Sequence, residues 1–137
     1  MSVRHAVLGM LFLAALPSLS HASCAAPTDL NAVWKADDGG LYYVRQVGNE
    51  VWWVGMSADE GRTWTNVFRG TRNGATVVGK WADVPRGGAK ANGMLKLAVQ
   101  ENNGAVAGFT RTEVTGGFGG SAWHLNCNDV VLVPVNE

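Results

Sequence analysis

Leu41 to Trp64 reads LYYVRQVGNEVWWVGMSADEGRTW, and this stretch decides the fold that the sequence predicts. In residues 40 to 47, and again in residues 50 to 57, aromatic and β-branched residues alternate with polar or small ones, as is typical of half-buried strands. Gly48-Asn49 between the two runs is a compact hairpin signal. The stretch therefore predicts an antiparallel hairpin that ends in a polar turn.

The same strand pattern continues along the rest of the chain and predicts an all-β protein. After residue 22, Gly recurs every few residues and no apolar run keeps the 3.6-residue period of a helix. Consecutive strands with short turns favour a small antiparallel up-and-down β-barrel of about eight strands, with a two-sheet β-sandwich as the alternative. We expect strands at 30–36, 40–47, 50–57, 64–70, 75–83, 93–101, 105–113, 119–125 and 129–134.

The connections between the expected strands differ in length and composition. Arg72-Asn73-Gly74 and Asn102-Asn103-Gly104 predict tight hairpin turns. Residues 85 to 92 contain no apolar residue larger than Ala or Pro, so we expect an exposed loop at one rim of the barrel. Gly116-Gly117-Phe118-Gly119-Gly120 has two interpretations: a strongly bent strand, or a backbone that approaches a ligand closely.

Residues 1 to 22 have the organisation of a secretory signal peptide. Arg4 and His5 precede an apolar run at 6 to 16, and Ser20-His21-Ala22 places small residues at the two positions that a signal peptidase reads. The apolar run is too short to span a bilayer. We therefore expect a protein secreted to the periplasm or the medium, without a membrane span, and one domain over residues 23 to 137.

The sequence has two cysteines, Cys24 and Cys127. An oxidising compartment favours a disulfide bond between them, which would tie the two ends of the domain together. The alternative is lipidation of Cys24, although that signal normally has a Leu-like residue three positions upstream, where His21 stands.

Ser57-Ala58-Asp59-Glu60-Gly61-Arg62-Thr63-Trp64 matches the pattern Ser-x-Asp-x-Gly-x-Thr-Trp. The match resembles the Asp box, or bacterial neuraminidase repeat, which is a turn between two antiparallel strands. The resemblance implies that Asp59 and Ser57 bond to the turn backbone, that Gly61 takes a positive φ, and that Trp64 packs into the sheet. It implies no activity, and eight or nine strands are too few for the propeller of a sialidase.

A second resemblance extends over most of the domain. Leu30-Asn31-Ala32-Val33-Trp34, Val78-Gly79-Lys80-Trp81-Ala82-Asp83 and Leu95-Lys96-Leu97-Ala98-Val99 are spaced like strands of avidin-type and lipocalin-type barrels. The Trp-rich closing strands with which avidins hold biotin have no counterpart, so the resemblance implies a barrel without a biotin site. Residues 42 to 53 also resemble the core of an uncharacterised family of secreted bacterial proteins, which implies no activity.

Charge and metal-ligand content exclude several classes of function. The sequence has 11 Lys and Arg and 11 Asp and Glu, without a block of one sign that would bind the phosphates of a nucleic acid. His124 is the only histidine after residue 22, so a zinc site of the usual ligands cannot be assembled. We expect no metal, no cofactor and no nucleic-acid partner.

The 6 Trp residues are the compositional outlier. Indole rings fill small β-cores, and they also form stacking platforms for sugars and other flat ligands. In residues 50 to 57, Trp52, Val54 and Met56 make the more continuous apolar series, which we assign to the core. Trp53 is then expected to point the other way, onto the outer surface or a recognition patch.

A ligand site is expected around the other exposed aromatic residues. Trp81 and Asp83 share one face of their strand, and such a pair can stack on a sugar ring and bond its hydroxyls. We predict that Tyr43, Trp53, Trp81 and Asp83 bind a saccharide or a small amphipathic molecule, with Arg45 as a polar anchor. This predicts a secreted, non-catalytic binding module for a glycan or another small-molecule ligand.

Two other functions stay open. A small disulfide-closed barrel suits a secreted protein-interaction or hydrolase-inhibitor role, in which the loop at 85–92 inserts into a protein partner. A small glycoside hydrolase is the second alternative, because paired carboxylates cleave glycosides, and Asp83 and Glu113 are the least easily explained as turn residues. A serine nucleophile is disfavoured, since Ser121 and His124 lie three apart and point to opposite faces of one strand.

Overall fold

The protein is an all-β barrel, which confirms the predicted fold class. The computed structural model describes residues 24–128, which form eight strands and no helix. The predicted signal peptide at 1–22 and the predicted strand at 129–134 lie outside the described residues. The strands are β1 (Ala32–Ala36), β2 (Leu41–Val47), β3 (Glu50–Met56), β4 (Thr65–Asn73), β5 (Thr76–Asp83), β6 (Asn92–Asn102), β7 (Ala105–Val114) and β8 (Ala122–Leu125).

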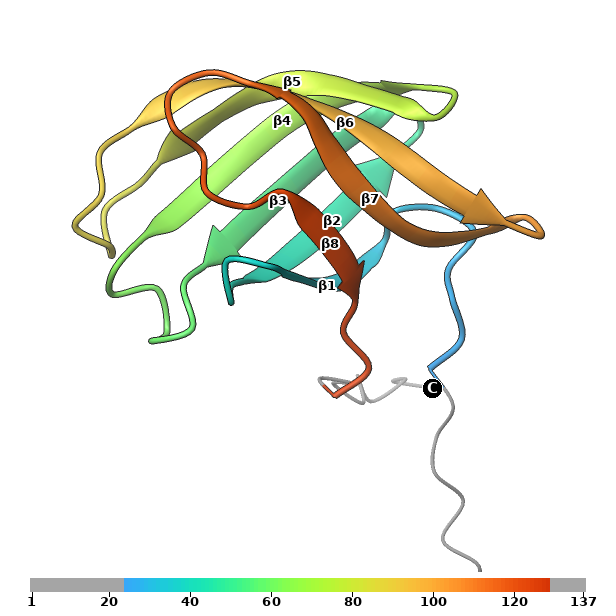
Figure 1. Ribbon diagram of the computed structural model, residues 1–137, viewed down its shortest axis with the longest axis horizontal. Helices are drawn as coiled ribbons and strands as arrows, with labels where there is room; N and C mark the ends of the chain where they lie inside the picture. Colours follow the sequence, from blue (N-terminus) through green and yellow to red (C-terminus); the bar gives the residue numbers. More distant parts are fainter. Residues whose placement is uncertain (1–23, 129–137) are drawn as a thin grey trace, which may run out of the picture.

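The eight strands form one closed antiparallel barrel (Figure 1). Each strand pairs with its neighbours in the sequence, and β1 pairs with β8 through Trp34 opposite Leu125. This closure confirms the up-and-down barrel over the two-sheet sandwich. Because successive strands alternate in direction, the connections gather at two ends. We call the end with the turns at 48–49, 74–75 and 103–104 the closed end, and the end with the connections at 37–40, 57–64, 84–91 and 115–121 the mouth.

Positive backbone φ angles make the closed-end turns compact. Gly48 has a φ of 58° and Gly74 one of 61°, while Asn103 and Gly104 have 52° and 79°. Glycine adopts this region without steric cost, and Asn tolerates it better than most residues. The hairpin turns predicted at these positions are therefore confirmed.

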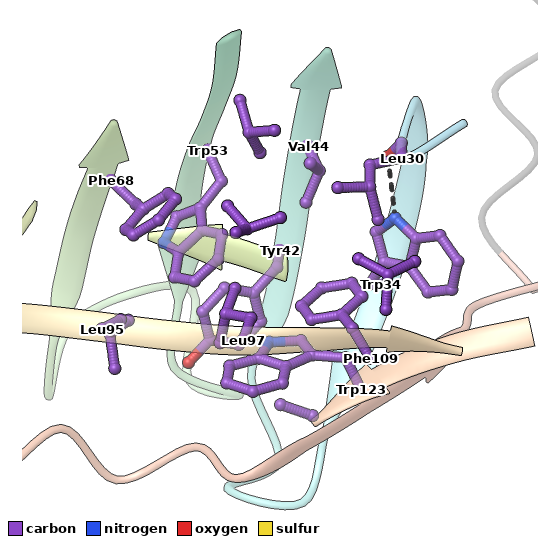
Figure 2. Packing of buried hydrophobic residues seen from close by; sticks show 14 of the residues in the cluster. Leu30, Trp34, Tyr42, Val44, Trp53, Phe68, Leu95, Leu97, Phe109 and Trp123 are labelled. Carbon is purple, nitrogen blue, oxygen red and sulfur yellow. Dashed lines mark hydrogen bonds between the residues drawn. The ribbon is translucent and has the colours of Figure 1, made fainter. Parts of the chain in front are cut away.

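Aromatic side chains fill the middle of the barrel (Figure 2). An eight-stranded barrel has an interior just wide enough for side chains. Trp53 stacks on Phe68 with ring centroids 4.2 Å apart, and Phe109 stacks on Trp123 at 4.9 Å. Tyr42 packs edge-on against both Trp53 and Trp123. Among the described residues, the middle of the barrel is therefore a packed core.

The inner face of β3 differs from the prediction. Trp53 is 4% exposed and lies inside the barrel, whereas Trp52 is 42% exposed, so the assignment of the Trp52 face to the core is wrong. The reason lies at Gly55, where a Cβ atom would come within 2.5 Å of the Tyr42 ring. The inner face of β3 therefore needs a small residue at position 55. The apolar residues of the outer face lie against cross-strand neighbours on β2 and β4.

The amino-terminal segment closes the end of the barrel opposite the mouth. Leu30 is buried, and its carbonyl accepts a hydrogen bond from Trp34 Nε1 at 3.0 Å (Figure 2). The Leu30 amide in turn donates to Gln46 Oε1 at 3.2 Å. A disulfide bond joins Cys24 to Cys127, with Cα atoms 5.2 Å apart, which confirms the predicted pairing and fixes this segment beside the end of β8.

Candidate functional site

A cavity of about 280 Å³ opens at the mouth of the barrel, and we call it the mouth cavity. All four connections of the mouth contribute to its walls. Barrel mouths commonly hold small ligands, because rigid strands there support loops of variable sequence. The lining residues are Asp38, Tyr42, Trp64, Asn66, Trp81, Asp83, Ala89, Ala91, Gly117, Phe118 and Gly119.

One inner row of the sheet supplies polar groups to the mouth cavity. Tyr42 lies opposite Gly55, Gly55 opposite Asn66, and Asn66 opposite Asp83. Residues opposite one another in a sheet share a face, so this row faces the barrel interior. A Cβ atom on Gly55 would lie 2.5 Å from the Tyr42 ring and 2.7 Å from Asn66 Oδ1, so these two side chains meet above the glycine. The row therefore holds its polar groups at the ends of rigid strands.

Four aromatic rings form a continuous wall beside this row. The rings of Trp64 and Tyr42 have centroids 5.8 Å apart, and those of Tyr42 and Phe118 are 6.2 Å apart. Phe118 in turn packs edge-on against Trp81 at 4.9 Å. We call Trp64, Tyr42, Phe118 and Trp81 the ring wall.

The glycine-rich connection at 115–121 turns sharply between β7 and β8 and lines the cavity. Gly116 and Gly117 have φ angles of 82° and 81°, which turn the chain so that Phe118 is buried. A Cβ atom on Gly117 or Gly119 would meet no other atom within 4 Å. The backbone at these two residues therefore borders open space.

Asp38 and Asp83 place two carboxylates at the mouth cavity. Asp38 accepts hydrogen bonds from the Tyr42 hydroxyl at 2.6 Å and from the Gly40 amide at 2.9 Å. Asp83 accepts one from the Ala91 amide at 2.8 Å, and this bond uses one of its two oxygens. Within residues 24–128 neither carboxylate forms an ion pair.

The other polar groups of the inner row have partners inside the barrel. Burial, and then the hydrogen bond to Asp38, raise the pKa of Tyr42 far above its ordinary value. The Tyr42 hydroxyl therefore stays protonated and acts as a donor to Asp38. Asn66, which is buried, accepts a hydrogen bond from Trp53 Nε1 at 3.0 Å. These bonds fix the orientation of the side chains beneath the cavity.

Hydrogen bonds within the connection at 57–64 place Trp64 in the ring wall. Asp59 accepts bonds from the Thr63 amide at 3.2 Å, from the Thr63 hydroxyl at 2.7 Å and from the Ser57 hydroxyl. Ser57 Oγ accepts a bond from the Trp64 amide at 3.2 Å. Asp and Ser side chains commonly satisfy turn amides in this way.

Two mouth connections are also joined to each other. Glu60 and Gly61 both have positive φ angles, of 63° and 80°. The Glu60 carbonyl, exposed by this turn, accepts a hydrogen bond from Arg86 Nε at 2.6 Å. This bond links the connection at 57–64 to the loop at 84–91, so the two sides of the mouth are held together.

Asp37 performs a similar role on the far side of the mouth. Its carboxylate accepts hydrogen bonds from the Ser121 amide at 2.8 Å, from the Ser121 hydroxyl and from the Ala122 amide at 3.3 Å. The bonds from Ser121 hold the pKa of Asp37 below its ordinary value. The Ser121 hydroxyl thus contacts Asp37, while His124 is exposed on the outside of β8.

Acid is expected to loosen the mouth before it unfolds the barrel. The hydrogen bond from Ser57, followed by those from Thr63, lowers the pKa of Asp59 to about 2. A carboxylate with a lowered folded-state pKa stabilises the protein above its unfolded pKa of about 4, and this contribution is lost as pH falls through the folded value. Melting temperatures should therefore fall between pH 4 and pH 2, and the Asp37→Asn, Asp59→Asn double variant should show a smaller fall. An equal fall in both proteins would contradict this assignment.

The structure divides the five predicted ligand residues between two faces of the barrel wall. Tyr43 and Arg45 lie on the outer face of β2. Trp53 and Trp81 are each 4% exposed and lie inside, and Asp83 lines the mouth cavity. Trp81 and Asp83 are the two that line the mouth cavity, and Trp53 and Trp81 both border a hollow on the outer side. The five residues cannot surround a single ligand, because adjacent strand positions point to opposite faces.

Five polar or aromatic residues that line the mouth cavity were not predicted as ligand residues from the sequence. The register of the hairpins is a signal for Tyr42 and Asn66. Pairing β2 with β3, β3 with β4 and β4 with β5 places Tyr42, Asn66 and Asp83 in one row. Asn66 is also a polar residue at an inward position of β4, where a core residue is expected. The unpredicted residues are Asp38, Tyr42, Trp64, Asn66 and Phe118.

The predicted carboxylate pair of a glycoside hydrolase does not meet. Glu113 is exposed on the outer face of β7, where Lys96 Nζ donates to it at 3.0 Å. Asp83 lies at the mouth cavity on the inner side of β5. The barrel wall separates these two carboxylates, so they do not face one substrate.

A more open hollow, which we call the outer depression, lies outside β3 to β6. Its exposed lining includes Trp52, Arg69, Lys80 and Met94, which follow one another across the strands in register. The Arg69 guanidinium lies 4.8 Å from the centroid of the Trp52 ring and 2.9 Å from Glu50 Oε1. This surface combines apolar and cationic side chains, and Trp81 borders both it and the mouth cavity.

Three further findings concern the function. Among residues 24–128, no group of three or more His, Cys, Asp or Glu lies close enough together to hold a metal ion. The same part of the chain contains no helix of sufficient length and apolar character to cross a membrane. The chain matches no protein-family model, and no curated protein or solved structure matches it significantly.

Proposed function

We propose that this protein is an exported, non-catalytic binding module that holds a saccharide or a small amphipathic molecule in the mouth cavity. The observation that carries the proposal is the joining of the ring wall and the polar inner row in one concave site. Small-ligand sites are typically concave, mainly apolar or aromatic, and contain a few fixed polar groups. Trp64 and Asp83 are partly exposed, so Trp64 offers a stacking surface and Asp83 can accept hydrogen bonds from hydroxyl groups.

The size of the cavity favours a small ligand. Its volume of about 280 Å³ lies near the lower end of the range for small-molecule sites. A single sugar ring or a molecule of similar size fits this space, and the rest of an oligosaccharide would extend over the rim. The exposed loop at 84–91 and the connection at 115–121 border that rim.

The proposal of export rests on two features. Residues 1 to 22 have the composition of a signal peptide, and the Cys24–Cys127 disulfide is of a kind that persists in oxidising compartments such as the periplasm. Together they support a location in the periplasm or outside the cell.

Titration with a ligand panel tests the proposed function. The oxidised protein, residues 23 to 137, is titrated with mono- and oligosaccharides and small amphipathic molecules while tryptophan fluorescence is recorded. We expect a saturable change with at least one ligand, because Trp64 and Trp81 line the cavity. A flat response to the whole panel would count against the proposal.

Two variants locate the site within such a titration. Ala89→Phe places a ring in the mouth cavity from the loop at 84–91 and should abolish binding. Trp52→Ala removes the exposed indole of the outer depression and should leave binding unchanged. The reverse result, with binding lost in Trp52→Ala and retained in Ala89→Phe, would place the ligand on the outer face.

A protein-interaction role is the second candidate, and the outer depression favours it. Trp52 and Met94 in this depression are 42% and 40% exposed, and Arg69 lies beside Trp52. Tyr, Trp, Met and Arg are the residue types enriched in protein interfaces. A pull-down tests this role. A protein that is retained by the wild type and by Ala89→Phe, and is lost with the Trp52→Ala, Arg69→Glu double variant, would support it.

A further inference from the structure

We infer that the ligand of the mouth cavity carries a positively charged amino or quaternary ammonium group, recognised by Asp38, Asp83 and the ring wall. This inference rests on the proposed function, since it names the chemical class of ligand for the same cavity. Two observations support it: the cavity holds two carboxylates without a cationic partner, and each carboxylate has an aromatic ring beside it.

In the part of the chain that the structure describes, the carboxylates of the cavity accept hydrogen bonds from neutral donors. These donors are the Tyr42 hydroxyl and a backbone amide for Asp38, and one backbone amide for Asp83. A neutral hydrogen bond satisfies an acceptor but leaves its negative charge uncompensated. The mouth cavity therefore carries the negative charges of two carboxylates. The site is partly enclosed, so water and salt screen these charges less than at an open surface.

The nearby basic residues are directed elsewhere or are unpaired. The Arg111 guanidinium donates to the carbonyls of Phe118 and Gly120 and so supports the connection at 115–121. Arg86 donates to the Glu60 carbonyl. Lys90 is exposed and forms no ion pair within residues 24–128. Within residues 24–128 none of these cations forms an ion pair with Asp38 or Asp83, so a charged ligand can take that place.

An aromatic ring lies beside each carboxylate, and Trp64 is the partly exposed ring of the wall. A Cβ atom placed on Gly120 would lie 3.1 Å from Asp38 Oδ2 and 3.1 Å from Phe118 Cε1, so this carboxylate and this ring border the same point. Asp83 lies two residues beyond Trp81 on the same face of β5, and both line the cavity. Ammonium groups are attracted both to carboxylates and to the faces of aromatic rings within about 6 Å.

A neutral ligand suits this cavity less well than a charged one. It would displace water from two carboxylates without offering a compensating charge, and such desolvation is unfavourable. A ligand that carries an ammonium group compensates the charge and keeps its apolar or sugar portion against the rings. Amino sugars and small quaternary amines combine these features within the volume available.

Pairs of matched probes test the charge directly. Choline is compared with its uncharged isostere 3,3-dimethylbutan-1-ol, and glucosamine is compared with N-acetylglucosamine at pH 6.5. Binding is followed by the shifts of the tryptophan indole N–H signals of the ¹⁵N-labelled protein. At least one charged probe should bind about tenfold or more tightly than its neutral counterpart, as a cation–π contact with a neighbouring carboxylate predicts.

Asp83→Asn is the informative variant, and Glu50→Gln is its control. An amide oxygen at position 83 can still accept the bond from the Ala91 amide, so the loop is expected to keep its shape. Glu50 lies in register with Thr71 and Val78, which places it about 17 Å along the strands from Asp83. Asp83→Asn should reduce the preference for the charged probe about tenfold, whereas Glu50→Gln should leave it unchanged.

The outcomes separate this inference from the proposed function. A preference for the charged probe that is lost in Asp83→Asn and kept in Glu50→Gln supports the inference. Equal or tighter binding of the neutral probes overturns it while the proposed function stands. If none of the four probes binds but another, neutral ligand of the panel binds saturably, the inference is overturned and the proposed function stands. No binding of any probe or panel member overturns both.

Discussion

Trp53→Ala is expected to lower the free energy of unfolding by about 3 to 5 kcal/mol, the usual cost of removing a buried indole. Trp53 is 4% exposed and stacks on Phe68 at 4.2 Å in the middle of the core. Its removal also takes away the donor to the buried Asn66 side chain. Chemical denaturation of the oxidised protein, followed by circular dichroism, measures the loss.

The neighbouring Trp52→Ala variant is the matched control. Trp52 is 42% exposed, and its main partner is the guanidinium of Arg69 on the outer face. An exposed cation–π contact is worth about 0.5 to 1 kcal/mol, so this variant should lose no more than about 1 kcal/mol. Equal losses in the two variants, or a larger loss for Trp52→Ala, would show that the inner and outer faces of β3 are assigned wrongly.

Reduction of the Cys24–Cys127 bond is expected to have an effect of similar size. The bond closes a loop with a sequence separation of 103, and the chain-entropy model gives a stabilisation of about 4 to 5 kcal/mol for such a loop. Single domains are typically stable by only about 5 to 15 kcal/mol, so the reduced protein should be marginal. Denaturation with and without reductant measures the difference.

A Cys24→Ser, Cys127→Ser double variant separates the bond from the effects of the reductant. It should denature like the reduced wild type, and it should no longer respond to reductant. The bond holds the amino-terminal segment that carries Leu30 beneath the barrel, so the loss of this bond should expose the closed end first. A change below about 1 kcal/mol would mean that β1 and β8 stay closed without the bond.

The fold followed from local patterns because turn chemistry and alternation are encoded over a few residues. Gly48, Gly74 and Gly104 occupy positive φ angles that the sequence signals predict, and the strands between them follow. Alternation identifies which residues share a face, as it did for Trp81 and Asp83. Alternation does not say which face is inside. On β3 the inner face includes Gly55, which must be small because the Tyr42 ring lies over it.

The mouth cavity was less predictable because it depends on contacts between distant segments. Asp38 and Phe118 come from connections about 80 residues apart, and only the pairing of β1 with β8 brings them together. Trp81 and Asp83 were found because they lie on one strand, where a two-residue spacing fixes a common face. Asn66, the remaining polar group, follows from the successive pairings of β2, β3, β4 and β5.

The most direct test of the mouth cavity as the ligand site follows the indole N–H signals of the 6 Trp residues during titration with glucosamine or the tightest-binding ligand of the panel. Trp81 Nε1 donates to the Thr115 carbonyl, and Trp53 Nε1 donates to Asn66, so both report on the mouth. Trp34 Nε1 donates to Leu30 at the closed end, and Trp52 lies outside. We predict saturable shifts for Trp81 and Trp53, with Trp34 and Trp52 unchanged. Saturable shifts confined to Trp52 would contradict a ligand site at the mouth.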